Sequence, residues 1–153
     1  MRRLSATAIM AVLLLVNATL AAGAAEDLKL RPGVSFTQDI DNGFPIVATD
    51  MDDTKIEAGK PALLFFGASG DLNTNRQAKR LVDLYRKGNA KEVKFIVIDV
   101  DHATADDAKK LIKTYYQGYI PCQVILDKSG KKAWSQIGEV EQNVVKAQLG
   151  KVL

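Results

Sequence analysis

The sequence is poor in the residues from which reactive centres are most often built. Its 153 residues include a single cysteine, Cys122, and a single histidine, His102. One cysteine cannot form an intramolecular disulfide, so the fold must be held by its apolar core. One cysteine and one histidine also cannot make a closed structural zinc site by themselves. We therefore expect no cofactor and no metal.

An excess of charge of either sign is also missing. The chain carries 21 basic and 18 acidic residues, a formal net charge of +3, and it has no long basic run. Nucleic acid is therefore not an expected partner, because its recognition calls for a basic face or stripe. The hydrophobic fraction of 47% is that of an ordinary globular chain with a real core.

The first 24 residues have the pattern of a secretory signal peptide. Arg2 and Arg3 form a positive start, the apolar run Ala6–Val16 follows, and Ala22–Ala24 makes an Ala-x-Ala cleavage site. The apolar run is short for a membrane span, although an uncleaved anchor is the alternative. We expect export to the periplasm or the medium of a bacterium, with no stable membrane insertion after cleavage.

The rest of the chain predicts an irregular N-terminal segment at 25–43 and one domain at 44–153. The run ALLFF is uniformly apolar and favours a strand buried on both faces, whereas 73–86 has helical spacing. Lys128–Lys131 is a hairpin turn. The expected strands are 44–48, 62–66, 93–100, 122–126 and 132–137, and the expected helices are 73–86, 105–116 and 139–153.

This order predicts an α/β fold with a mixed central sheet and helices on both faces. Strands that alternate with helices favour parallel crossovers, and the last hairpin adds an antiparallel edge. In the final helix we expect the following residues to face inward: Val140, Val144, Ala147, and Leu149 or Val152.

The same order resembles the thioredoxin superfamily. The stretch KPALLFFGAS is similar to the strand that delivers the redox site, and YIPCQVILDKSGK is similar to the segment around the cis-proline of that family. Gly138 matches a glycine common before the last helix. The resemblance covers 61–153 well and 44–59 loosely, and it implies a three-layer thioredoxin-like fold in which Pro121 is cis.

The chain departs from the family where the family carries its Cys-x-x-Cys motif. Aligned by the strand, Asp71 and Thr74 occupy the two cysteine positions, and Phe65 stands near the place of a buried acid. A helix start stabilises a thiolate, but a carboxylate there cannot exchange disulfides. We therefore interpret Asp71, Asn73 and Thr74 as helix caps and expect no dithiol oxidoreductase activity.

The resemblance also implies where a partner would bind. In this fold the start of the first helix faces the segment around the cis-proline, and an extended peptide pairs beside that proline. The expected binding groove consists of Gly70, Asp71, Leu72, Asn73, Thr74, Ile120, Pro121 and Cys122.

Cys122 is the one candidate for catalysis. A reachable thiol beside Pro121 and a helix start would suit a single-cysteine thiol-disulfide oxidoreductase. Alternatively, it is a strand thiol that packs as a small apolar residue. Asp101 and His102 follow a strand and could join Cys122 as a base or as part of an open metal site, or they are a surface loop.

Three tyrosines, Tyr115, Tyr116 and Tyr119, flank the approach to Pro121 and form either an aromatic lip or packing. Three functions stay open. The first is a non-catalytic module that binds an extended peptide or envelope protein, in a redox or protein-maturation context. The second is a one-cysteine oxidoreductase, and the third is a small-ligand or metal carrier that uses Asp71, His102 and Cys122. The sequence leaves the oligomeric state open.

Overall fold

The computed structural model describes residues 27–88 and 90–153. The expected signal peptide and its cleavage site lie outside these residues. Within them, no helix is both long enough and apolar enough to cross a membrane.

A four-stranded mixed sheet forms the centre of the fold, with the strand order β4-β3-β5-β6. Its strands are β3 (Ala62–Gly67), β4 (Lys94–Asp99), β5 (Cys122–Leu126) and β6 (Lys132–Ile137). β3 is parallel to β4 and antiparallel to β5, which pairs antiparallel with β6. The predicted α/β class and mixed sheet are confirmed.

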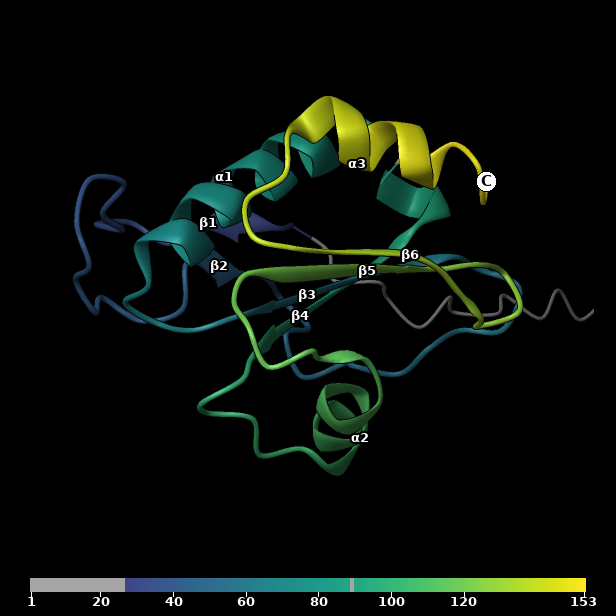
Figure 1. Ribbon diagram of the computed structural model, residues 1–153, viewed down its shortest axis with the longest axis horizontal. Coiled ribbons are helices and arrows are strands. Elements are labelled where there is room, and N and C mark those ends of the chain that lie inside the picture. The colour runs from purple at the N-terminus through teal and green to yellow at the C-terminus, as the bar shows by residue number, and fades with distance from the viewer. Residues whose placement is uncertain (1–26, 89) are drawn as a thin grey trace, which may run out of the picture.

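The expectation of parallel crossovers is correct for β4 and wrong for β5. The helix between these strands does not run back along the sheet, since Figure 1 shows it nearly end-on while the strands extend across the view. The chain therefore enters β5 opposite the carboxyl end of β3, where Cys122 pairs with Phe66.

Three helices cover the two faces of the sheet. They are α1 (Leu72–Lys87), α2 (Asp106–Tyr115) and α3 (Gln142–Leu149), with a short 3-10 helix, η1 (Ala90–Glu92), before β4. α1 and α3 lie on one face and α2 lies on the other (Figure 1). Helices on both faces complete the three layers that the sequence predicts.

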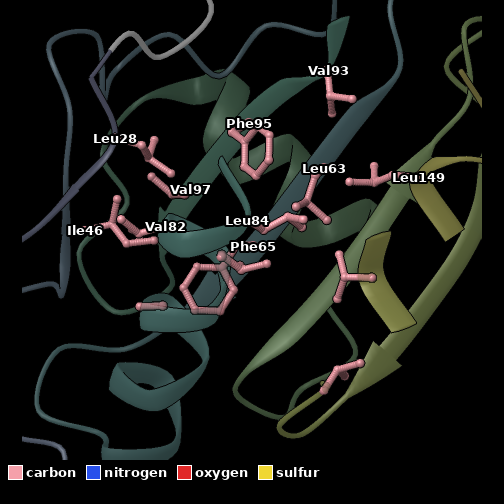
Figure 2. Packing of buried hydrophobic residues seen from close by; sticks show 14 of the residues in the cluster. Leu28, Ile46, Leu63, Phe65, Val82, Leu84, Val93, Phe95, Val97 and Leu149 are labelled. Carbon is pink, nitrogen blue, oxygen red and sulfur yellow. The ribbon is translucent and has the colours of Figure 1, made fainter. Parts of the chain in front are cut away.

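β3 divides the apolar core into two clusters because its side chains alternate between the faces of the sheet. Leu63 and Phe65 pack under α1 and α3, and Figure 2 shows Leu63 beside Leu149 and Phe95. Leu64 and the other alternate residues pack against α2. Each fully buried leucine or phenylalanine side chain contributes about 1.5–3 kcal/mol, so this strand stabilises both halves of the molecule.

Residues 27–43, the described part of the segment expected to be irregular, contribute to the core. β1 (Lys29–Leu30) pairs antiparallel with β2 (Ile46–Val47) in a separate two-stranded sheet. Leu28, just before β1, is only 1% exposed and packs in the cluster under α1 (Figure 2). A two-residue strand is too short to show a periodic pattern, which is why the sequence analysis missed it.

The inward face of the last helix also differs from the expectation. Val144 and Ala147 are exposed, whereas Val145 and Leu149 are buried. The helix begins at Gln142 rather than at residue 139, and the i, i+4 pair 145 and 149 then faces the sheet. Val140 is buried as expected, but it lies before the helix begins.

A buried lysine fixes the loop that precedes β3. Lys94 opens β4, is 1% exposed, and places Nζ 2.8 Å from Asp53 Oδ2 and 3.3 Å from Glu57 Oε1. Burial acts to raise the pKa of Asp53, but the hydrogen bond from Lys94 and the charges of Lys94 and Lys55 outweigh it and lower the pKa. The loop is thereby held at the amino end of the parallel strand pair.

We predict that Leu28→Ala lowers the free energy of unfolding by about 2–5 kcal/mol, because it opens a cavity in the core under α1. Ile40→Ala is the matched control in the same N-terminal segment, since Ile40 is 40% exposed. Its effect should stay within about 0.5 kcal/mol. Urea denaturation followed by circular dichroism measures both, and equal effects would show that Leu28 is not part of the folded core.

Candidate functional site

The start of α1 carries its own cap. Asp71 is the N-cap residue, as the sequence predicts, and its Oδ1 accepts a hydrogen bond from the Thr74 backbone N–H at 2.6 Å. A carboxylate at this position satisfies a free helical N–H and interacts favourably with the positive helix end. The position that the resemblance gives to a reactive cysteine therefore holds a structural acceptor.

Thr74 is fully buried at the junction of β3 and α1. Its Oγ1 accepts a hydrogen bond from the Ala68 N–H at 3.3 Å. Its Cγ2 lies so close to Gly67 that a Cβ built on that glycine would be 2.4 Å away. Thr74 therefore fills the junction and offers no group to a ligand, whereas Asn73 beside it is exposed.

A segment that the sequence analysis did not implicate lies against the same helix start. We call residues 33–43 the capping loop. Asp39 Oδ1 accepts a hydrogen bond from the Leu72 N–H at 2.8 Å, and the carbonyls of residues 35 and 36 accept from Asn75 Nδ2 and Arg76 Nε. Part of the expected groove is thus occupied by the chain itself.

The loop also lies close to Gly70, whose φ is +83°. A Cβ built on Gly70 would be 3.1 Å from Asp41 Cβ. The only sequence signal for this contact is a polar segment with two aspartates between two glycines, which by itself does not identify its target.

Cys122 does not face the start of α1. The residue pairs with Phe66, and alternate residues of β5 (Cys122, Val124 and Leu126) point into the cluster beneath α2. Its side chain is 0% exposed. Burial raises the pKa of the thiol, against weaker opposing effects of the Gln117 N–H and the Lys132 charge. The thiol is therefore a poor nucleophile in the folded chain.

We predict that Cys122 reacts with a disulfide reagent such as DTNB at least about tenfold more slowly in the folded chain than in urea, because the thiol is buried and its pKa is raised. Asn73→Cys in a Cys122→Ala background is the control, since it places an exposed thiol at the start of α1. That thiol should react rapidly. Fast labelling of Cys122 in the folded wild-type chain would contradict the burial.

Asp99 organises the carboxyl end of β4, a role that the sequence analysis did not give to it. Its Oδ2 accepts a hydrogen bond from Ser69 Oγ at 2.6 Å and lies 2.9 Å from His102 Nδ1. Its Oδ1 accepts from the Asp101 N–H at 3.1 Å. The sequence signal for this role is a carboxylate at the end of an apolar strand, two residues before Asp101.

The grouping of Asp101 and His102 with Cys122 is not formed. His102 is 69% exposed and bonded to Asp99, while Cys122 is enclosed in the core. Ser69 and His102 share one oxygen of Asp99, so the histidine does not lie between a serine and a carboxylate as a catalytic relay requires. Across residues 27–88 and 90–153, no three His, Cys, Asp or Glu side chains are arranged to hold a metal ion.

We predict that the pKa of His102 lies above 6.5, raised chiefly by its hydrogen bond with Asp99 and by the charge of that residue. A pKa that is higher in the folded chain than in the unfolded chain makes the pair stabilising below pH 6.5. That stabilisation disappears as the pH rises through the folded value. NMR titration of the imidazole measures the pKa, and Asp99→Asn should lower it; an unchanged value would exclude Asp99 as the cause.

The segment before β5 carries the remaining residues of the expected groove. The Ile120–Pro121 peptide bond is cis, and the Pro121 carbonyl accepts a hydrogen bond from the Gly138 N–H at 2.8 Å. Within the described chain, the backbone groups of residues 118–120 form no backbone hydrogen bond. This short stretch therefore has free backbone donors and acceptors beside the proline.

The three tyrosines divide between packing and exposure. Tyr115 and Tyr116 are half-buried, and the Tyr116 ring packs 5.7 Å from the ring of Phe66. Tyr119 is 68% exposed. Of the two alternatives, packing therefore applies to Tyr115 and Tyr116, and only Tyr119 could contribute to an aromatic lip. Whether the groove residues bind a ligand stays a prediction.

We predict that Asp71→Ala lowers the free energy of unfolding by about 1 kcal/mol, because it leaves the Thr74 N–H without its cap. Asp71→Asn is the control, since an asparagine oxygen can accept the same hydrogen bond and should restore most of the stability. Thermal unfolding compares the three chains. If Asp71→Ala is as stable as the wild type, capping is not the role of this residue.

Comparison with known proteins supports the fold and goes no further. No protein-family model matches the chain, and no curated protein matches it. Among solved structures, StoA from Bacillus subtilis is 18% identical, with a TM-score of 0.51 over 61% of this chain and 84% of its own. A thioredoxin-like protein from Clostridium perfringens is 18% identical, with a TM-score of 0.52 over 68% of this chain and 86% of its own.

Thioredoxin-2 of the malaria parasite is similar at 17% identity, with a TM-score of 0.52 over 60% of this chain and 82% of its own. Together with the mixed sheet between helical layers, these likenesses define the class: the chain has a thioredoxin-like fold. The chain has a single cysteine, Cys122, and its thiol is buried.

Proposed function

We propose that this chain is an exported thioredoxin-like module that binds an extended peptide or an envelope protein without redox catalysis. The observation that carries the proposal is that neither the start of α1 nor Cys122 offers a reachable thiol. The helix start holds a capping carboxylate, and the one thiol is enclosed under α2. The thioredoxin-like fold is therefore present without a reactive thiol at either position.

The backbone before Pro121 supports a binding role. Residues 118–120 carry free N–H and C=O groups within the described chain, and Tyr119 adds an exposed ring beside them. An extended peptide can pair with such a backbone edge, while an aromatic side chain supplies contact area at small entropic cost. The binding face proposed here is therefore Gly118–Pro121 together with the start of α1.

The alternative, a single-cysteine oxidoreductase, is less well supported. It needs a thiol that solvent and a partner disulfide can reach, whereas Cys122 is fully buried and its pKa is raised. Exchange at this position would first require the loop before β5 to separate from the core.

Export rests on the N-terminal pattern of a positive start, an apolar run and an Ala-x-Ala site. When the full chain is produced in a bacterium, the periplasmic or secreted form should begin at Ala25, as N-terminal sequencing would reveal. A product that keeps Met1 and stays with the membrane fraction would contradict export.

The binding role is tested by quantitative capture from envelope extracts on immobilised protein. Ile120→Asp introduces a charge into the proposed face and should abolish most of the capture. Val144→Asp is the matched control, because Val144 is 40% exposed on α3 and lies outside the face. Capture that survives Ile120→Asp, or that Val144→Asp reduces equally, would refute this binding face.

A further inference from the structure

We propose that the capping loop is an intramolecular ligand of α1, and that it opens to admit an acidic peptide segment at the same donors. The inference rests on the proposed function only for the incoming peptide, since the opening of the loop is a property of this chain alone.

The loop shows what the start of α1 recognises. A carboxylate oxygen of Asp39 accepts from the Leu72 N–H at 2.8 Å. The Ser35 and Phe36 carbonyls then accept from Asn75 Nδ2 at 2.9 Å and from Arg76 Nε at 3.2 Å. One carboxylate and two successive backbone carbonyls are features that any extended acidic peptide can present.

The fit of the loop is incomplete at Asn75. This side chain is only 2% exposed, and its Oδ1 has no hydrogen-bond partner within the described chain. The carboxamide lies directly under the loop, since its Nδ2 is bonded there. An unpaired buried acceptor costs free energy, so a peptide that also supplied an N–H to Oδ1 would bind better than the loop does.

The ends of the loop are fixed while its middle is exposed. Asn42 Nδ2 donates to the Gly33 carbonyl at 2.7 Å, and Arg31 Nε donates to the Phe44 carbonyl at 2.8 Å. Gly33 and Gly43 both have positive φ, at +83° and +88°. These hydrogen bonds keep the two ends of the loop together. The residues between them can therefore move away from α1 without separating β1 from β2.

The charges near the start of α1 favour replacement of the loop by another acidic segment. The loop brings Asp39 and Asp41 to the start of α1, and the charge of Asp41 helps to raise the pKa of His102. An acidic segment that replaces the loop leaves the charge near α1 and His102 unchanged, whereas a neutral or basic segment removes a favourable interaction.

The first test measures the loop by itself, by amide hydrogen exchange in the expected mature chain. Asp39→Ala should accelerate exchange of the Leu72 amide at least about tenfold, because it removes the acceptor of that N–H. The Thr74 amide is the internal control, since it is capped by Asp71, the N-cap residue of α1, and not by the loop. If Leu72 is unaffected, the loop does not close the site and the proposal is overturned.

The second test measures the exchange of ligands. The probe is a fluorescent peptide with the sequence of residues 33–43, and the protein is a chain in which three glycines replace residues 34–42. The peptide should bind this chain at least about tenfold more tightly than the intact chain. The Asp39→Asn version of the peptide should bind at least about fivefold more weakly.

Equal affinity for the two chains, or for the two peptides, would overturn the proposal. If the shortened chain does not fold, Asp39→Ala in the intact chain takes its place in the same binding assay. Ile120→Asp separates the two proposals: it should leave the Leu72 exchange unchanged even where it abolishes capture from extracts. If only the capture from extracts fails, the proposed function is refuted. If Asp39→Ala leaves the Leu72 exchange rate unchanged, the proposal that the loop closes the start of α1 is refuted.

Discussion

The structure depends on the burial of β3 on both faces. This strand is flanked by β4 and β5 and carries the two apolar clusters on its alternate sides. An apolar strand of this kind requires a helix layer above and below it, so α1, α3 and α2 are all placed by the same constraint. The end of β3 then fixes where α1 starts, and therefore where the candidate site lies.

The sequence predicts those parts whose causes are local. The uniform run ALLFF predicts β3, and the residues after Pro121 predict β5. Asp71 is predictable as a cap because its hydrogen-bond partner is three residues away. The face of the sheet toward which Cys122 points depends on how β5 pairs with β3, and no local sequence pattern encodes that pairing. Asp39 reaches Leu72 across 33 residues, a contact that only the folded chain defines.

The candidate site separates the parts that a redox centre would bring together. The acceptor at the start of α1 is a carboxylate, the thiol lies in the opposite layer, and the histidine is bonded to Asp99 at the strand end. Each group has a structural partner of its own, so none is free to act on another. Asn73, Gly118, Tyr119 and the His102 ring stay exposed to solvent.

The contact between Gly67 and Thr74 has a consequence for how such a chain can evolve. Because a Cβ at position 67 would lie 2.4 Å from Thr74 Cγ2, the two positions cannot vary independently. Cysteine lacks the branching methyl group of threonine and leaves that space empty. A side chain at position 67 can therefore be accommodated only if position 74 changes as well.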